Sequence, residues 1–188
     1  ALANQGIHHV DLLRYFGGEV ARVNATMRTL GVEIEAEDTV VATFDFVSGA
    51  VGTLEVTTAA RPEVDFEASL SIVGSKGLAQ IGGIAVNELQ IFTPDPTICQ
   101  AHSEDFAGLY GRGHEFLYHD AHNFLSTGAT PPVSRADCLG TLRLLHAFYR
   151  SDEVGHWVEV AGEEESIRLG RPNEEISNLY RTVDPIGG

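Results

Sequence analysis

Positive charge is scarce in this sequence. Lys76 is the single lysine, and 12 basic residues stand against 27 acidic ones, which gives a net charge of -15 at pH 7. A field of this sign repels phosphate backbones, so the composition argues against a nucleic-acid-binding protein. No apolar run approaches the roughly 18 residues that a membrane-spanning helix needs, so we expect no membrane span.

Cysteine is scarce as well. Cys99 and Cys138 are the two present, and they form neither a metal-type spacing nor a disulfide framework, which favours a reducing, cytoplasmic location. The opening residues, Ala1–Gly6, contain no initiator methionine, no basic segment and no long apolar stretch. They resemble neither a natural start nor a signal peptide, so we expect the chain to be part of a longer protein.

The remaining composition is that of an ordinary globular protein: 188 residues, 43% hydrophobic and 21% charged, within the size of one domain.

Helical periodicity predicts three helices. The first spans Ile7–Phe16 and is ended by Gly17 and Gly18. The second carries an apolar stripe and is ended by Gly128; the stripe consists of Leu117, Ala121, Phe124 and Leu125. The third spans Arg135–Val154, with Ser134 as its N-cap and Gly155 as its stop; its expected buried stripe is Cys138, Leu142, Leu145 and Phe148 or Tyr149.

Between the first two helices, β-branched and aromatic runs separated by short turns predict antiparallel strands. They are expected at Arg22–Leu30, Thr39–Phe46, Val51–Thr58, Phe66–Val73, Leu78–Ile81 and Leu89–Phe92, with a last short strand at Trp157–Val160. Grouped strands flanked by helices indicate an α+β fold, an open, mostly antiparallel β-sheet with helices on one face. We expect one domain over residues 1–160 and a peripheral tail over residues 161–188.

The predicted strands have two different faces. One face is apolar and must meet the helices; it carries Val40, Ala42, Phe44, Phe46, Leu54, Val56, Phe66, Ala68, Leu70 and Ile72. The other is polar with mostly short side chains, which suits either solvent or a flat contact between subunits. We predict a homodimer through Thr43, Thr53, Thr57, Ser69 and Ser71.

The first helix holds the most chemically suggestive polar set. Asn4, His8 and Asp11 follow one another at i, i+4 and i+7 and share one helix face. An imidazole held at a cleft can take a proton from an alcohol, an amide one turn earlier can orient that alcohol, and Asp11 can orient the imidazole. The same residues also suit helix capping and ordinary surface hydrogen bonds, and the spacing leaves both interpretations open.

The run from Asn4 to Gly18 resembles the signature helix of the Gfo/Idh/MocA family of NAD(P)-dependent oxidoreductases, in which an (Asp/Asn)-x-x-x-His-x-x-Asp pattern begins the substrate side of the active site. The resemblance covers about residues 1–160. Further similar segments are the hairpin at 40–56 with Asp38, Phe46, Gly49 and Gly52, the turn at 74–77, and the closing helix and strand at 142–158.

This resemblance implies a two-domain enzyme that oxidises a secondary alcohol of a sugar or nucleotide sugar, with His8 accepting the hydroxyl proton and Asn4 and Asp11 on the substrate side. NAD or NADP would bind mainly to an N-terminal Rossmann domain that is absent from this chain. The glycine-rich run at 110–114 is similar to one in family members that act on nucleotide-linked amino sugars or uronic acids, which implies substrate contacts at Tyr110, Arg112 and His114.

The sequence also departs from the family pattern. Asn4 stands where many members have Asp, so hydrogen bonding to a hydroxyl is retained there but an acid–base role is not implied. No Gly-x-Gly-x-x-Gly unit and no Glu-Lys-Pro segment occurs, so we expect the isolated chain to be inactive. Two alternatives remain: a non-catalytic binding or dimerisation module, and a metal site at Glu115, His119 and His122, at i, i+4 and i+7 of one helix.

Overall fold

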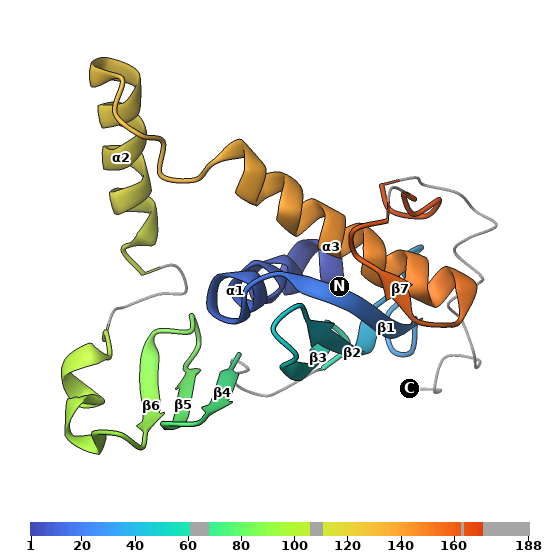
Figure 1. The fold of residues 1–188 in the computed structure, drawn as a ribbon, viewed down its shortest axis with the longest axis horizontal. Helices are drawn as coiled ribbons and strands as arrows, with labels where there is room; N and C mark the ends of the chain where they lie inside the picture. The colour runs from blue at the N-terminus through green and yellow to red at the C-terminus, as the bar shows by residue number, and fades with distance from the viewer. Residues whose placement is uncertain (61–67, 106–110, 163, 171–188) are drawn as a thin grey trace. The chain divides into compact units, whose positions relative to one another are not determined.

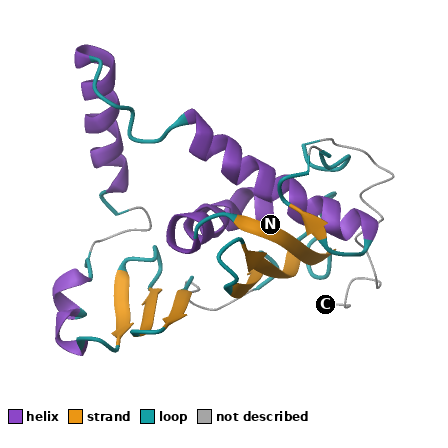
Figure 2. Ribbon diagram, viewed as in Figure 1, coloured by secondary structure: helices purple, strands orange, loops and turns teal. Residues whose placement is uncertain are grey.

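The structure, a computed structural model, describes residues 1–60, 68–105, 111–162 and 164–170. Its elements belong to two units, which we call the first unit (Ala1–Arg61 and Arg135–Gly188) and the second unit (Pro62–Ser134) (Figure 1). Helices and antiparallel strands occur in both (Figure 2). None of the described helices has the length and apolar character needed to cross a membrane.

A four-stranded antiparallel sheet forms the centre of the first unit. Its strand order is β3-β2-β1-β7. The strands are β1 (Val20–Arg28), β2 (Thr39–Phe46), β3 (Val51–Thr57) and β7 (Val158–Glu159); the helical elements are η1 (Leu2–Gly6), α1 (Ile7–Gly17) and α3 (Arg135–Val154). The helix bounds and the β2–β3 hairpin confirm the sequence prediction to within a residue.

The two α-helices of the first unit, α1 and α3, cover one face of this sheet. Phe44 of β2 meets Phe148 of α3 edge-on, with 6.4 Å between ring centroids. Gly17 of α1 lies against the Phe46 ring so closely that a Cβ there would collide with it. Alternate residues of β2 are buried on this face, as the period of two predicts. The hydrophobic core therefore lies between the sheet and the α1–α3 pair.

The opposite face of the sheet carries no helix among the described residues. Thr43 lies opposite Thr53, and both are exposed. Arg22 and Asp45 are also opposite each other, and their side chains form an ion pair at 2.6 Å. The pair offsets the charge of Asp45 on this face. The result is a mixed surface on which short threonine side chains stand beside the exposed Val41, Val51 and Glu55.

Side chains of α3 complete the side of β1 that β7 leaves open, because β7 pairs with only two residues of β1. The backbone N–H of Ala25 donates to the Ser151 hydroxyl at 3.1 Å, and that of Met27 donates to the Asp152 carboxylate at 2.9 Å. Asp152 also accepts a hydrogen bond from Arg168 at 2.8 Å. The segment after β7 is thereby tied to α3, with Ser166 buried against it.

The second unit contains a three-stranded antiparallel sheet in the order β4-β5-β6. Its elements are β4 (Leu70–Gly74), β5 (Gly77–Gly82), β6 (Glu88–Phe92), the short 3-10 helices η2 (Pro96–Ile98) and η3 (Gln100–His102), and α2 (Gly113–Thr127). Gly128, with φ of 71°, ends α2 in the left-handed conformation that the sequence predicts.

The structure corrects several details of the sequence prediction. The described strands form two sheets instead of one, and Ser69 and Ser71 therefore lie in a different unit from Thr43. Cys138 and Leu142 are exposed; the buried residues of α3 are Thr141, whose hydroxyl bonds to α1, and a run that begins at Leu144. The predicted α2 stripe is not buried either, since no described element of the second unit packs extensively on this helix. Phe66 lies outside the described residues.

Candidate active site

A π-helical turn presents the polar residues at the start of α1. The Gly6 N–H bonds to the Ala1 carbonyl at 3.1 Å, five residues back, which defines a π turn. A Cβ on the buried Gly6 would lie 3.0 Å from side-chain carbons of both Leu2 and Val56, so glycine lets η1 sit against β3. Such turns recur at functional sites, and here the turn ends two residues before His8.

His8 and Asn4 are both exposed at this end of α1. Asn4 accepts a hydrogen bond from the Gln5 side chain at 3.0 Å. His8 forms no hydrogen bond with another described residue. The expectation that Asn4, His8 and Asp11 share one continuous α-helical face is wrong in one respect, because Asn4 lies in the wider π turn. An exposed imidazole without a hydrogen-bond partner among the described residues can accept a proton from a bound ligand.

The neighbouring His9 differs from His8 in its environment. Its imidazole is partly buried, and burial together with the adjacent His8 lowers its pKa below the usual histidine value. The neutral form of His9 therefore dominates at pH 7. Of the two histidines, the exposed His8 is the one positioned to meet a ligand.

Asp11 is held by α3 and makes no hydrogen bond to His8. The Thr141 hydroxyl donates to its carboxylate at 2.6 Å. Arg14, one turn further along α1, donates to the Thr141 hydroxyl at 3.0 Å and to the Asp137 carbonyl at 2.9 Å. Asp11 is nevertheless exposed as a residue. Sequence reasoning did not identify Thr141, which is 130 residues away and has no local signal that points to Asp11.

A buried carboxylate holds the start of η1. Glu37 is 1% exposed, and its Oε1 accepts the Leu2 backbone N–H at 2.9 Å and the Tyr149 hydroxyl at 2.7 Å. Glu37 precedes β2 and Tyr149 lies on α3, so three distant segments meet at this oxygen. Sequence reasoning did not find Glu37 either, because a single glutamate beside Asp38 carries no signal of burial.

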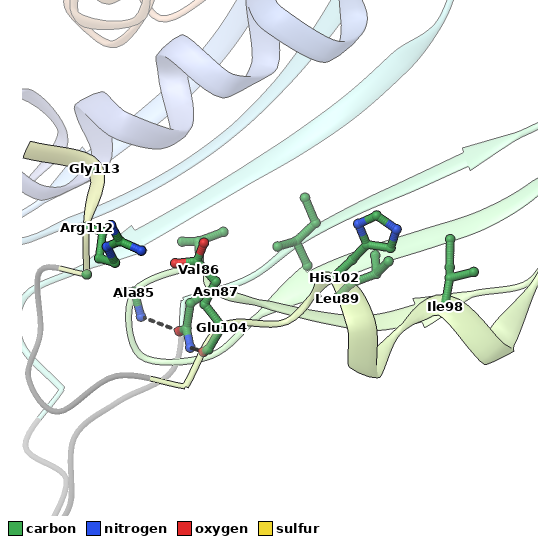
Figure 3. A pocket seen from close by; sticks show the side chains of 11 residues that line it. Ala85, Val86, Asn87, Leu89, Ile98, His102, Glu104, Arg112 and Gly113 are labelled. Carbon is green, nitrogen blue, oxygen red and sulfur yellow. Dashed lines mark hydrogen bonds between the residues drawn. The ribbon is translucent and has the colours of Figure 1, made fainter. Parts of the chain in front are cut away.

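The second unit contains a cleft of about 590 Å³ between the β5–β6 connection, the two 3-10 helices and the start of α2 (Figure 3). Apolar side chains form much of its lining, and polar groups stand among them. The lining residues are Ile81, Ala85, Val86, Asn87, Leu89, Ile98, His102, Glu104, Gly111, Arg112 and Gly113. A cleft of this size and composition suits a small organic ligand.

Arg112 is the predicted substrate residue that lines this cleft. Its guanidinium is exposed and bonds to Glu115 at 3.2 Å, within reach of the Phe116 ring. His114 is exposed in the first turn of α2 and is not part of the lining. Tyr110 lies outside the described residues. The structure thus brings Arg112 and the glycines beside it to the cleft, without His114.

The wall of the cleft is braced at Asn87. Its side chain accepts the Ala85 N–H at 3.2 Å and donates to the Glu104 carbonyl at 2.6 Å, drawing the β5–β6 connection and the segment after η3 together. Val86, which lies between Ala85 and Asn87 in the sequence, has φ of 55°, the one positive value among the described non-glycine residues. A β-branched residue tolerates this conformation poorly, and such strain is often found at ligand sites.

Neither a metal centre nor a dinucleotide cradle is built by the described residues. They contain no group of three or more His, Cys, Asp or Glu side chains placed to hold a metal ion, so Glu115, His119 and His122 do not form the alternative site. The run Gly111–Gly113 opens a helix, but it lacks the third glycine of the dinucleotide-binding pattern. These features do not fit the pyrophosphate of a nicotinamide cofactor.

The sequence and structure of this chain are similar to those of known proteins. Residues 1–80 match the family described as the GFO/IDH/MocA C-terminal domain. A curated D-apiose dehydrogenase from Rhizobium rhizogenes is 25% identical over 163 residues, which are 82% of this chain and 47% of that protein. The chain therefore spans about half the length of this relative.

Two solved structures are more similar in sequence, both of WlbA dehydrogenases in complex with NADH and UDP-GlcNAcA. The Bordetella pertussis protein is 35% identical, with a TM-score of 0.74, over 85% of this chain and 47% of its own. The Chromobacterium violaceum protein is also 35% identical, with a TM-score of 0.72, over 83% of this chain and 44% of its own. The similarity again covers about half of each relative.

Proposed function

Because this chain carries the C-terminal domain of the GFO/IDH/MocA oxidoreductase family, we propose that it is the substrate-binding and subunit-contact half of a nicotinamide-dependent dehydrogenase. The reaction is oxidation of a secondary alcohol in a sugar or nucleotide sugar. Residues 1–160 serve as the substrate domain, and residues 161–188 as a peripheral extension.

The observation that carries this proposal is the exposed His8 behind a π turn, in a chain 35% identical to two dehydrogenases of a nucleotide-sugar type. In the proposed reaction His8 accepts the proton of the substrate hydroxyl as the carbon is oxidised. Asn4 hydrogen-bonds the sugar hydroxyls beside it. Asp11 accepts a further hydrogen bond from the substrate on the same side. Its carboxylate can do so because Thr141 engages one of its oxygens.

We also propose substrate contacts in the second unit, considered by itself. Arg112 lies at the glycine-rich entrance to α2, where backbone and guanidinium can approach a carboxylate or phosphate closely. Tyr110 and His114 flank it in the sequence and are proposed as further contacts. UDP-GlcNAcA, the molecule bound by the WlbA dehydrogenases, carries both kinds of anion, and a related acidic nucleotide sugar is the substrate class proposed here.

The described residues offer no dinucleotide cradle, so we place NAD or NADP mainly on a part of the protein outside this chain. The redox step therefore needs that part. The free thiols of Cys99 and Cys138 support a cytoplasmic enzyme.

We also propose that the chain is a homodimer through the open face of its four-stranded sheet. Thr43, Thr53 and Thr57 are exposed there, and short hydroxylated side chains suit a flat symmetric contact. The Arg22–Asp45 ion pair supports this assignment because it reduces like-charge repulsion across a two-fold axis. Ser69 and Ser71, which complete the predicted set, are exposed in the second unit.

The function is tested by assaying the protein together with its cofactor-binding half. NADH or NADPH formation is followed by absorbance with UDP-GlcNAcA, UDP-GlcNAc and D-apiose as substrates. We expect turnover with the acidic nucleotide sugar to exceed that with the neutral one. Absence of nicotinamide reduction with every sugar and nucleotide sugar would overturn the proposal.

A further inference from the structure

Thr141 connects α3 to the helix that carries His8. It is 6% exposed, and its hydroxyl lies between two charged groups of α1: the Asp11 carboxylate at 2.6 Å and the Arg14 guanidinium at 3.0 Å. An ionised carboxylate only accepts and a guanidinium only donates. The hydroxyl must therefore donate to Asp11 and accept from Arg14, and it has no alternative orientation.

The surroundings reinforce this junction. Arg14 also donates to the Asp137 carbonyl at 2.9 Å and to the Glu19 carboxylate at 2.7 Å. A Cβ on Gly140 would collide with the Arg14 guanidinium, so glycine at this position allows the guanidinium to lie directly on α3. The Arg14 side chain is only 11% exposed, although it carries a full charge.

Asp11 and Arg14 are three residues apart and lie on neighbouring positions of α1. Fixing both of them against one hydroxyl fixes the rotation of α1 about its axis. His8 is one turn before Asp11, and no hydrogen bond to another described residue holds its imidazole. Its location therefore depends on how α1 is seated.

From this geometry we propose that Thr141 is a positioning residue for His8, acting through the Asp11–Thr141–Arg14 bridge. Its place in the reaction rests on the proposed function. The bridge itself does not, because it is a contact between two helices of this chain. Without the hydroxyl, Asp11 and Arg14 lose a shared partner and α1 becomes free to shift on α3.

The test uses Thr141→Val, which keeps the side-chain shape and removes the hydroxyl, and Thr141→Ser, which restores it. Thr29→Val is the matched control, because Thr29 is similarly buried and donates to the Ala36 carbonyl far from His8 in sequence. Two NMR readouts are taken on the whole chain: amide hydrogen exchange along α1, and the ring resonances of His8.

Thr141→Val is expected to speed exchange of the α1 amides about tenfold, as loss of a hydrogen bond to charged groups implies, and to shift the His8 resonances. Thr141→Ser returns both toward wild type, and Thr29→Val leaves both unchanged. If Thr141→Val changes the α1 amides and His8 no more than Thr29→Val does, the proposal is overturned. If α1 and His8 respond but the assembled protein oxidises no sugar, the bridge stands and the proposed function fails.

Discussion

The hydroxyl of Tyr149 donates a 2.7 Å hydrogen bond to the buried Oε1 of Glu37, the same oxygen that accepts the Leu2 N–H. Tyr149→Phe removes the hydroxyl and leaves a buried carboxylate with one partner fewer. We expect the free energy of unfolding to fall by about 1–3 kcal/mol, the usual cost of such a loss. Urea denaturation measures the difference.

Tyr15→Phe serves as the control for that change, since Tyr15 is 79% exposed on α1 in the same unit. Its unfolding free energy should stay within about 0.5 kcal/mol of wild type. If Tyr149→Phe and Tyr15→Phe change the unfolding free energy equally, the hydrogen bond to Glu37 does not contribute to stability.

His8→Ala is predicted to remove the proton acceptor of the proposed dehydrogenase, assayed together with its cofactor-binding half. Loss of general-base help lowers kcat by roughly 100- to 10,000-fold, while substrate binding measured by calorimetry should change little. His156→Ala is the control, because His156 is exposed and its imidazole lies at hydrogen-bond distance from the carbonyl of the adjacent Trp157. Near-wild-type turnover in His8→Ala would disprove the assignment.

Asp38 is predicted to make stability depend on pH at the acid end. Burial alone raises the pKa of Asp38, but the N–H groups of Gly31, Leu30 and Val32 and the Thr39 hydroxyl outweigh burial and hold the pKa below its ordinary value. The ionised form is thus favoured in the folded state. Its stabilising contribution is complete above the ordinary aspartate pKa of about 3.9 and is lost as pH falls through the lower folded-state pKa.

Asp38→Asn should therefore be clearly less stable than wild type at pH 7, and the gap should narrow progressively below about pH 4. Unfolding free energies at a series of pH values provide the measurement. Asp120→Asn, at an exposed position of α2, is the control and should stay close to wild type throughout. If the difference in unfolding free energy between Asp38→Asn and wild type stays constant down to the lowest pH measured, the proposed dependence of stability on Asp38 ionisation is contradicted.

Thr53→Arg is predicted to break the proposed dimer. Thr53 lies opposite Thr43 on the open sheet face, where a long cation would meet its symmetry mate and obstruct a flat contact. Light scattering at micromolar concentration should report twice the 20.3 kDa chain mass for wild type and the single mass for the variant. Ser75→Arg, in the exposed β4–β5 turn, should remain a dimer. A wild-type chain that is itself monomeric would remove the basis of this prediction.

Local patterns were sufficient to predict much of the fold. The β2–β3 hairpin follows from the alternation of apolar and polar residues over Thr39–Phe46, broken only at Val41, and from the short turn after it. The bounds of α3 follow from its period and from Gly155, whose φ of 73° ends the helix. These signals lie within a few residues of the feature they specify, so a single sequence contains them.

The parts that the sequence could not specify depend on distant partners. Leu142 has helical spacing for burial, yet it is 48% exposed, and the apolar buried run of α3 begins at Leu144. Thr141 and Glu37 matter through contacts with Asp11 and Tyr149, which are 130 and 112 residues away. No local periodicity records such pairings. At the candidate site, the location of His8 on a helix was therefore predictable, whereas the groups that seat this helix were not.

The side-chain hydrogen bonds along β1 also bear on aggregation. An unpaired strand edge is a template on which another molecule can add a strand, and proteins that leave long edges open risk growth into fibrils. Past the short β7, Ser151 and Asp152 already occupy the N–H groups of Ala25 and Met27. A foreign strand would have to displace a helix to reach them. Among the described residues, the edge strands of the four-stranded sheet are thus β3 and the two-residue β7, and beyond β7 the edge of β1 is occupied by the same helix that completes the core.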